Sequence, residues 1–247
     1  MSDNSIEKEF YIRQHRLEHQ AGIDHNFDTD LKVIYDSWFS DKKRYHVIEE
    51  TLDKSKQYNL LLEVGSAGGA TLKYFSENYK FKKIIGYDIA FSETTLFKQK
   101  KYKNIELIEG NFNYDISQEN NSVDCLVLMM IIEHLFDPFH SFSEIHRLLS
   151  KEGLAFINLP LVTSIKNRYR LLLGKLPETS VEYNRWFADK EWDGNHLHYF
   201  SINSIKKICK KYNLEIVKIR PVGEMIFLKK LFPSLFANEI SFCVKKK

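Results

Sequence analysis

The chain has 247 residues, of which 43% are hydrophobic and 28% are charged, and its formal net charge is +3. This composition is typical of globular proteins, and it excludes the disordered, collagen-like and disulfide-stapled classes. Because positive and negative charges nearly balance, we expect neither nucleic acid nor an anionic membrane as a partner.

The spacing of the cysteines and the length of the apolar runs indicate in which cellular compartment the protein is expected. The 3 cysteines, Cys125, Cys209 and Cys243, lie far apart and form no CxxC pair. This pattern argues against a disulfide framework or a structural zinc site and favours a reducing cytoplasm. The longest apolar run, Cys125–Ile132, is well short of the ~20 residues that span a bilayer. With a polar N-terminus, neither a signal peptide nor a membrane anchor is expected.

The N-terminal segment differs from the rest of the chain. Residues 1–50 carry apolar side chains at helical spacing and show no strand pattern. This spacing predicts a helical N-terminal cap, followed by one main domain over residues 51–247.

The middle of the chain alternates between apolar runs and helix-like segments. The predicted strands are Asn59–Gly65, Lys83–Ile89, Ile105–Gly110, Val123–Ile132 and Gly153–Pro160. The predicted helices between them are Gly69–Tyr79, Ser92–Tyr102 and Pro138–Leu149. Strands that are apolar on both faces and alternate with helices are typical of a doubly wound α/β fold with a mostly parallel sheet.

The last third of the chain breaks this alternation. Residues 161–199 are far longer than the ~2–6 residues of an ordinary connection, which predicts a lid or substrate-binding insertion after the fifth strand. Ser201 then caps a predicted helix, and Leu214–Pro221 and Glu239–Val244 are predicted strands. Their short connection favours an antiparallel pair, which completes a seven-stranded sheet.

The segment Glu63–Gly69 (EVGSAGG) follows the first predicted strand and opens the first helix. Small residues let its backbone turn tightly beside a ligand, and the helix N-terminus offers free N–H groups. Asp88 closes the second strand, where a carboxylate can bind both hydroxyls of a ribose. A nucleoside-containing cofactor is therefore expected. Glu63 would repel a pyrophosphate but suits an amino group and a sulfonium cation, which argues against NAD.

Several motifs, in this order, resemble the class I S-adenosylmethionine-dependent methyltransferases, in particular their small-molecule group. Besides EVGSAGG and YDIA, they are IELIEGNFNY, VDCLVLMMIIEHLFDP, LLSKEGLAFINLP and HLHYFSINSIKKICKKYNLEIVKI. The resemblance covers about residues 45–220. It implies a Rossmann-like sheet, S-adenosylmethionine as the cofactor and methyl transfer as the reaction. The chain departs from the family at Ala67, where glycine is usual, and at Asn111, where Asp is more common.

The resemblance also implies a set of cofactor-binding residues. The first of them would organise and wrap the methionine end of S-adenosylmethionine. Those further along the chain would hold its ribose, face its adenine and lie beside the methyl group that is transferred. For a methionine in an apolar strand, a role in core packing is an equal alternative to a role beside the methyl group. The set is Glu63, Gly65, Ser66, Ala67, Gly68, Gly69, Asp88, Ile89, Asn111, Phe112, Met129 and Met130.

Glu133 and His134 end the fourth predicted strand, at the edge where ligands of open α/β sheets bind. They either order the turn into the next helix or take part in catalysis. His134 and His196 are the candidate general bases, because an imidazole pKa of ~6.5 suits proton transfer at neutral pH. Glu133 would orient one of them.

No metal is expected at these residues. In a quinone-biosynthesis branch of the family the pattern E-x-x-E-H binds a divalent metal, but Met130 occupies the first acidic position here. The pair His196-x-His198 offers two further nitrogen ligands, and no third ligand is evident beside it.

Three rival functions stay open. An NAD-dependent oxidoreductase is disfavoured by the acidic Glu63, and a nucleic-acid methyltransferase by the strand ending IIEH in place of an Asn/Asp-Pro-Pro-aromatic clamp. A non-catalytic interaction module is harder to exclude, since a cofactor site does not prove turnover.

The acceptor is expected to be a small molecule with a hydroxyl group, such as a sugar, a nucleotide-sugar or a phosphorylated metabolite. Arginines and aromatic rings in the insertion would bind it through charge-assisted hydrogen bonds and stacking. A protein-facing surface is the alternative for these residues, and a homodimer is one open assembly. They are Arg168, Tyr169, Arg170, Tyr183, Arg185, Trp186 and Trp192.

Overall fold

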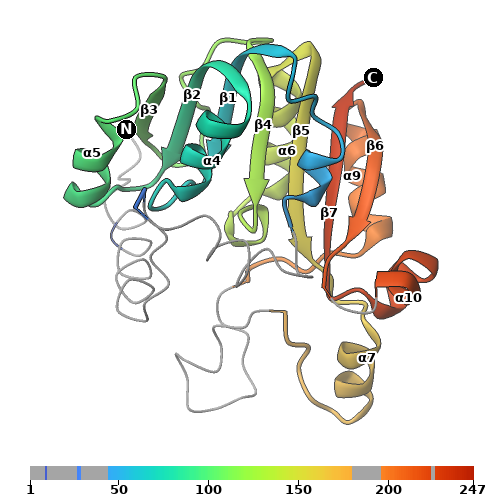
Figure 1. Cartoon of the computed structure of the whole chain (residues 1–247). Helices are drawn as coiled ribbons and strands as arrows, with labels where there is room; N and C mark the ends of the chain where they lie inside the picture. The colour runs from blue at the N-terminus through green and yellow to red at the C-terminus, as the bar shows by residue number, and fades with distance from the viewer. Residues whose placement is uncertain (1–8, 10–26, 29–43, 180–195, 224–225) are drawn as a thin grey trace.

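A seven-stranded sheet organises the chain, in the strand order β3-β2-β1-β4-β5-β7-β6 (Figure 1). The structure is a computed structural model, and it describes residues 9, 27–28, 44–179, 196–223 and 226–247. The strands are β1 Gln57–Val64, β2 Lys80–Asp88, β3 Ile105–Glu109, β4 Val123–Met129, β5 Leu149–Pro160, β6 Leu214–Pro221 and β7 Glu239–Lys246. The first five pair in parallel, and β7 runs antiparallel to both β5 and β6. The predicted doubly wound class and the antiparallel final pair are thus confirmed.

Helices cover both faces of this sheet. They are α3 His46–Glu49, α4 Ala70–Asn78, α5 Glu93–Gln99, α6 Pro138–Leu148, α7 Ile165–Leu172, α9 Ile202–Lys211, α10 Ile226–Leu231 and α11 Pro233–Phe236, with a 3-10 turn η1 at Ile132–His134. One apolar cluster joins the sheet to α6 and α9, and a second joins it to α3 and α4. Because both faces are covered, the central strands are almost continuously buried rather than alternating.

Several predicted strand boundaries differ from the structure, and two of these differences have a clear cause. The fourth strand was expected to reach Ile132, but β4 ends at Met129, because Met130 adopts a left-handed φ of 59° that leaves the extended conformation. The fifth was expected to begin at Gly153, whereas β5 begins at Leu149, which pairs with Val123 ahead of a register shift. Tertiary pairing, which no local pattern reports, decides the second boundary.

The helices begin where the sequence provides caps. The Ser92 hydroxyl accepts a hydrogen bond from Thr95 N, and Asp137 accepts one from Phe139 N with Pro138 in the first turn. Ser201 forms a capping box with Ser204, as expected for α9. The cap before α6 is therefore Asp137, and Glu133 and His134 lie in η1 instead.

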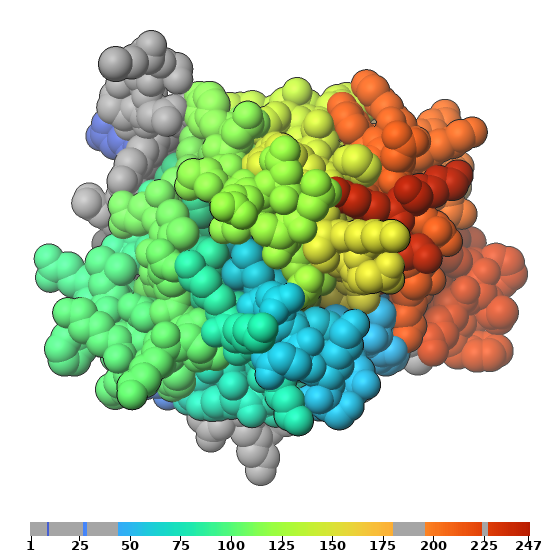
Figure 2. All heavy atoms as spheres, turned by 90° about the horizontal axis from the view of Figure 1, so that it is seen from above, coloured from blue at the N-terminus to red at the C-terminus, as the bar shows by residue number. Residues whose placement is uncertain are grey.

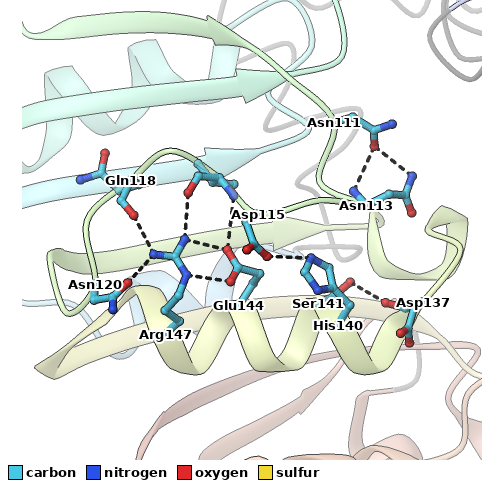
Figure 3. A network of polar contacts seen from close by, with 11 residues as sticks. Asn111, Asn113, Asp115, Gln118, Asn120, Asp137, His140, Ser141, Glu144 and Arg147 are labelled. Carbon is cyan, nitrogen blue, oxygen red and sulfur yellow. Dashed lines mark hydrogen bonds and ion pairs between the residues drawn. The ribbon is translucent and has the colours of Figure 1, made fainter. Parts of the chain in front are cut away.

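A buried ion pair fixes the connection between β3 and β4 onto α6 (Figure 3). Arg147 Nε and Nη2 donate to the two carboxylate oxygens of Glu144, both at 2.7 Å. The same guanidinium donates to the backbone carbonyls of Ile116 and Gln118 at 2.9 and 2.8 Å. The carboxylate in turn accepts from Ile116 N. One arginine therefore satisfies several carbonyls of a segment that has no regular structure.

The end of the sheet where the parallel strands begin is closed by short polar contacts. Seen from above in Figure 2, the segment that leads into β1, the chain around residue 150 and the C-terminal strand meet on this face. Asp124 accepts hydrogen bonds from Asn59 N at 2.6 Å and from the Ser150 hydroxyl at 3.0 Å. The carboxyl ends of the parallel strands lie on the opposite side, where α7 also lies (Figure 1).

The predicted cap and insertion are described only in part. In the cap, α3 packs into the second apolar cluster, and most of residues 1–43 lie outside the described residues. The insertion contains α7, which Ser164 caps, and residues 180–195 lie outside the described residues. Within the part of the chain that the structure describes, no helix has the length and apolarity to cross a membrane.

Candidate functional site

The strand order reverses between β1 and β4, so the loops that follow these strands diverge and leave room for a ligand. The glycine-rich turn after β1 lies at this position. Gly65 N donates to Tyr87 O at 2.8 Å, and Gly69 N donates to Ser66 O at 2.9 Å. Both glycines have positive φ, of 75° and 84°, a conformation that other residues rarely adopt.

Two further residues of the turn behave differently from its glycines. Ala67 has a φ of 44° and is exposed, so an alanine occupies a left-handed position at the rim of the turn. The Ser66 hydroxyl is buried, faces Gly86 of β2 and has no hydrogen-bond partner among the described residues. Gly68, the next residue along the chain, is buried.

Asp88, at the end of β2, is brought against this turn. Its carboxylate accepts hydrogen bonds from Ala67 N at 2.8 Å and from Ile89 N at 2.7 Å, and the residue is 7% exposed. From the sequence, Asp88 is expected to bind a ribose. The structure adds that the same carboxylate holds the turn in place, and a carboxylate oxygen can accept more than one hydrogen bond.

Glu63 is buried at the end of β1. Its carboxylate accepts hydrogen bonds from the Thr71 hydroxyl at 2.5 Å and from the Tyr45 hydroxyl at 3.4 Å. The pKa of Glu63 is raised to about 7, mainly by burial. Asp88 contributes to this rise, and the hydrogen bonds from the two hydroxyls oppose it. An acid in this state gains most from a cationic ligand, because the ligand would restore its charged form.

Side chains occupy the space beside two of the glycines. A Cβ on Gly65 would lie 2.0 Å from Ile131 Cδ1, and a Cβ on Gly69 would lie 2.4 Å from the Phe27 ring. Phe27 also stacks on Tyr102, with ring centroids 5.3 Å apart. The turn is therefore packed closely by residues from the N-terminal region and from the segment after β4.

The residues expected to face an adenine lie in the loop after β3. Asn111 Oδ1 accepts from Asn113 N and Nδ2, at 3.0 and 2.9 Å (Figure 3). Asn113 Oδ1 accepts from Phe136 N at 2.7 Å, which ties this loop to the segment after η1. Phe112 is buried in the first apolar cluster, and Ile89 is half-buried. Their roles toward a cofactor stay predictions.

Met129 and Met130 end β4 beside these loops. Met129 packs against the second apolar cluster and is half-buried. Met130 is also half-buried, and its N–H donates to Asn158 O at 3.2 Å. Its left-handed backbone is the type of strain that clusters at ligand sites.

The structure brings His196 against Glu133 and His134, although His196 comes from a distant segment of the chain. One ligand atom from each lies within 4.8 Å of the others, and the two imidazole centroids are 4.8 Å apart. Glu133 O accepts hydrogen bonds from Leu197 N at 2.9 Å and His198 N at 3.2 Å, which docks the end of the insertion on η1.

The environment of this group is strongly desolvated. Burial raises the pKa of Glu133 to about 8, and Arg44 opposes the shift. Burial also lowers the pKa of His196 to about 3, with His134 adding to the effect. His196 is therefore neutral at physiological pH, while His134 is less buried.

Three supporting residues escaped the sequence analysis. Thr179 contacts His196, with Oγ1 and Nδ1 2.6 Å apart, and Thr71 and Tyr45 bind Glu63. Thr71 is the second residue of α4, directly after the glycine-rich turn, so its position in the sequence could have indicated it. Thr179 lies in a segment without a recognisable pattern, and the helical spacing around Tyr45 does not indicate its contact with Glu63.

The arginines proposed for the acceptor are engaged within the insertion. Arg168 Nε donates to Thr163 O and Arg170 Nε to Leu176 O, both at 2.8 Å. Arg170 also pairs with Glu178 at 3.7 Å. Tyr183, Arg185, Trp186 and Trp192 lie outside the described residues.

Comparisons with known proteins agree with this architecture. A family model described as a methyltransferase domain matches residues 38–219. No curated protein matches the chain. Among solved structures, an S-adenosylmethionine-dependent methyltransferase from Mesorhizobium loti is 11% identical, with 84% of this chain and 98% of that chain covered and a TM-score of 0.61. One from Aquifex aeolicus is 16% identical, with 84% and 92% covered and a TM-score of 0.55.

A third structure is a complex between a methyltransferase activator and a methyltransferase from Haloferax volcanii. It is 12% identical to this chain, with 87% of this chain and 92% of that chain covered and a TM-score of 0.59. At these identities the structures show a shared fold.

Proposed function

The chain belongs to the methyltransferase family whose domain model it matches, and from this premise we propose that it transfers a methyl group to a hydroxyl of a small molecule. It is an S-adenosylmethionine-dependent enzyme. The observation that carries the proposal is the gathering of Glu133, His134 and His196 at the strand edge that also holds the glycine-rich turn.

The residues at the end of β1 and β2 fit this cofactor. S-adenosylmethionine supplies an electrophilic methyl carbon on a cationic sulfur. The buried carboxylate of Glu63 suits its positive charges, and Asp88 has acceptor capacity for ribose hydroxyls. The turn from Gly65 to Gly69 lets its backbone approach the ligand closely.

The acceptor hydroxyl must lose a proton as its oxygen attacks the methyl carbon. Burial lowers the pKa of His196 to about 3, so its imidazole is a poor base at neutral pH. We therefore assign the proton transfer to His134. The His196 ring positions it by direct contact, and the Glu133 carbonyl holds the segment that carries His196. Alignment of acceptor and methyl group supplies most of the remaining rate enhancement.

A reducing, cytoplasmic setting is part of the same proposal. Cys125, Cys209 and Cys243 are all buried free thiols. Free thiols are the expected state in a reducing compartment.

The test is turnover by His134→Asn. S-adenosylhomocysteine release is first screened against sugars, nucleotide-sugars and phosphorylated metabolites to identify an acceptor. We expect His134→Asn to lower kcat by ~10²–10⁴-fold, the usual loss of a general base. Its affinity for S-adenosylhomocysteine and its Tm should stay near those of the parent.

His140→Asn is the matched control, because His140 is a partly exposed histidine on α6. A His134→Asn enzyme that folds and turns over within threefold of the parent would remove His134 as the base. Release of the product only with a protein or nucleic-acid acceptor would overturn the small-molecule proposal.

A further inference from the structure

We propose that Glu133, His134 and His196 form a binding site for one divalent transition-metal cation of the Zn²⁺ type. Their candidate ligand atoms all lie within 4.8 Å of one another. Three atoms at such spacing share a centre about 2.8 Å or less from each, and small side-chain rotations close this to the ~2.0–2.2 Å of zinc–nitrogen and zinc–oxygen bonds.

The Glu133 carboxylate is the first indication of a cation-binding site. The residue is 0% exposed, and neither of its carboxylate oxygens has a hydrogen-bond partner among the described residues. A buried carboxylate without a partner is costly, and buried charges in proteins are as a rule paired or bound to a metal. Arg44, the cation whose charge acts on Glu133, pairs with Glu239, with contacts of 2.5 and 3.2 Å.

Thr179 supplies the second indication. Its hydroxyl lies 2.6 Å from His196 Nδ1. With Nδ1–H donating to this oxygen, the neutral imidazole carries its lone pair on Nε2, the nitrogen that can bind a metal. Metal-bound histidines typically have their second nitrogen fixed in this way, which sets the tautomer and the ring orientation.

The donor set indicates the class of ion. Two imidazole nitrogens and one carboxylate suit Zn²⁺, Fe²⁺ or Co²⁺, whereas Mg²⁺ and Ca²⁺ prefer oxygen ligands alone. Three protein ligands leave an open coordination position, as in catalytic zinc sites. A hydroxyl group bound there would ionise more easily. With the ion bound, His134 is a ligand, so the ion rather than a free His134 imidazole would promote loss of the hydroxyl proton. The proton transfer assigned to His134 applies to the metal-free chain, and only this catalytic role of the ion rests on the proposed function.

This site departs from the expectation that no metal binds. That expectation rested on two features of the sequence: no third ligand is evident next to His196-x-His198, and position 130 is not an acid. The structure pairs His196 with Glu133 and His134 instead, because the end of the insertion docks on η1 through two backbone hydrogen bonds. His198 points elsewhere, with Nε2 3.1 Å from Phe136 O.

The experiment measures cation binding by the full chain without any turnover. Protein freed of metal with a chelator is titrated with Co²⁺, followed by its visible d–d absorption, and with Zn²⁺ by calorimetry. We expect one ion per chain, and Mg²⁺ in large excess should not displace Co²⁺. Binding at no defined stoichiometry, or easy displacement by Mg²⁺, would overturn the proposal.

Variants locate the site. Glu133→Gln keeps the side-chain shape and should weaken Co²⁺ binding at least tenfold, as should His196→Asn. Thr179→Val should weaken it by ~10–100-fold through loss of the orienting contact. His198→Asn, from the same segment, should bind like the parent. Equal affinity in Glu133→Gln, His196→Asn and the parent would place the ion elsewhere and refute the proposal.

Binding of S-adenosylhomocysteine reports that each variant is folded. If Glu133→Gln does not fold, His196→Asn and Thr179→Val decide the question. A chain that methylates an acceptor but never binds Co²⁺ or Zn²⁺ contradicts only the cation site. A chain that binds the ion but has no small-molecule acceptor contradicts only the proposed function.

Discussion

Glu63 shows how a single buried acid can couple cofactor binding to pH. Its pKa rises from an ordinary 4.5 to about 7 because the side chain is buried. For an acid with a raised pKa, the contribution of that group to the stability of the free protein is fully present below pH 4.5 and is lost as the pH rises through 7. A cationic cofactor favours the charged form, so its affinity should change in the opposite direction.

We therefore expect S-adenosylmethionine to bind about tenfold more tightly at pH 8 than at pH 6, as a proton must leave Glu63 on binding. Glu63→Gln should weaken binding and flatten this pH dependence. Calorimetry in buffers of different ionisation enthalpy measures both the affinity and the released proton. The same pH slope in Glu63→Gln as in the parent would assign the proton to another group.

Ala67 is a second residue-scale feature, because its φ of 44° suits glycine better than alanine. Ala67→Gly should raise the free energy of unfolding by about 0.5–1 kcal/mol, since relief of strain exceeds the entropy gained by the unfolded chain. Chemical denaturation measures the change. Asn213→Gly is the control, as asparagine tolerates its φ of 52° and little gain is expected there. A destabilised Ala67→Gly would mean that the methyl group makes contacts that outweigh the strain.

At the scale of elements, Arg147 holds an irregular connection onto α6. The pair is asymmetric, with side-chain exposures of 27% for Arg147 and 4% for Glu144. Arg147→Met should lower the free energy of unfolding by about 1–3 kcal/mol, because it leaves Glu144 buried without a cation and frees several carbonyls. Urea unfolding gives the value.

Lys83→Met is the comparison, since the Lys83–Glu106 pair has exposures of 53% and 49%. An exposed pair contributes about 0–1 kcal/mol, so this change should be small. Equal losses in the two variants would show that burial does not set the strength of the Arg147 pair. Because Asn113 of the same connection contacts Phe136 N, Arg147→Met should also weaken cofactor binding slightly.

For the whole molecule, cofactor binding should stabilise the fold by mass action. A ligand at a concentration of 100 Kd adds about 2.7 kcal/mol to the free energy of unfolding. For a chain of this size, that corresponds to a rise in Tm of about 5–10 °C. Differential scanning fluorimetry with S-adenosylhomocysteine tests this, with NADH as the control ligand. A shift with NADH and none with S-adenosylhomocysteine would contradict the cofactor assignment.

The sequence by itself determined the fold class and the residues that meet around the glycine-rich turn. Each depends on local patterns: apolar runs between helices, a glycine-rich turn after a strand, and an acid at the end of the next strand. Parallel strands place such ends at one edge whatever the rest of the chain does. The sequence alone therefore predicts that Glu63, Asp88 and the turn lie together, and in the structure they do.

Tertiary structure alone decided the grouping of Glu133, His134 and His196. His196 is separated from Glu133 in the sequence, and their meeting depends on backbone bonds between η1 and residues 197–198 that have no signature in the sequence. The contacts of Thr179 with His196 and of Tyr45 with Glu63 are likewise not predicted by the patterns of the segments that they join. The physical reason is that local patterns set elements, whereas long-range docking of irregular segments depends on packing and burial that emerge only once the chain is folded.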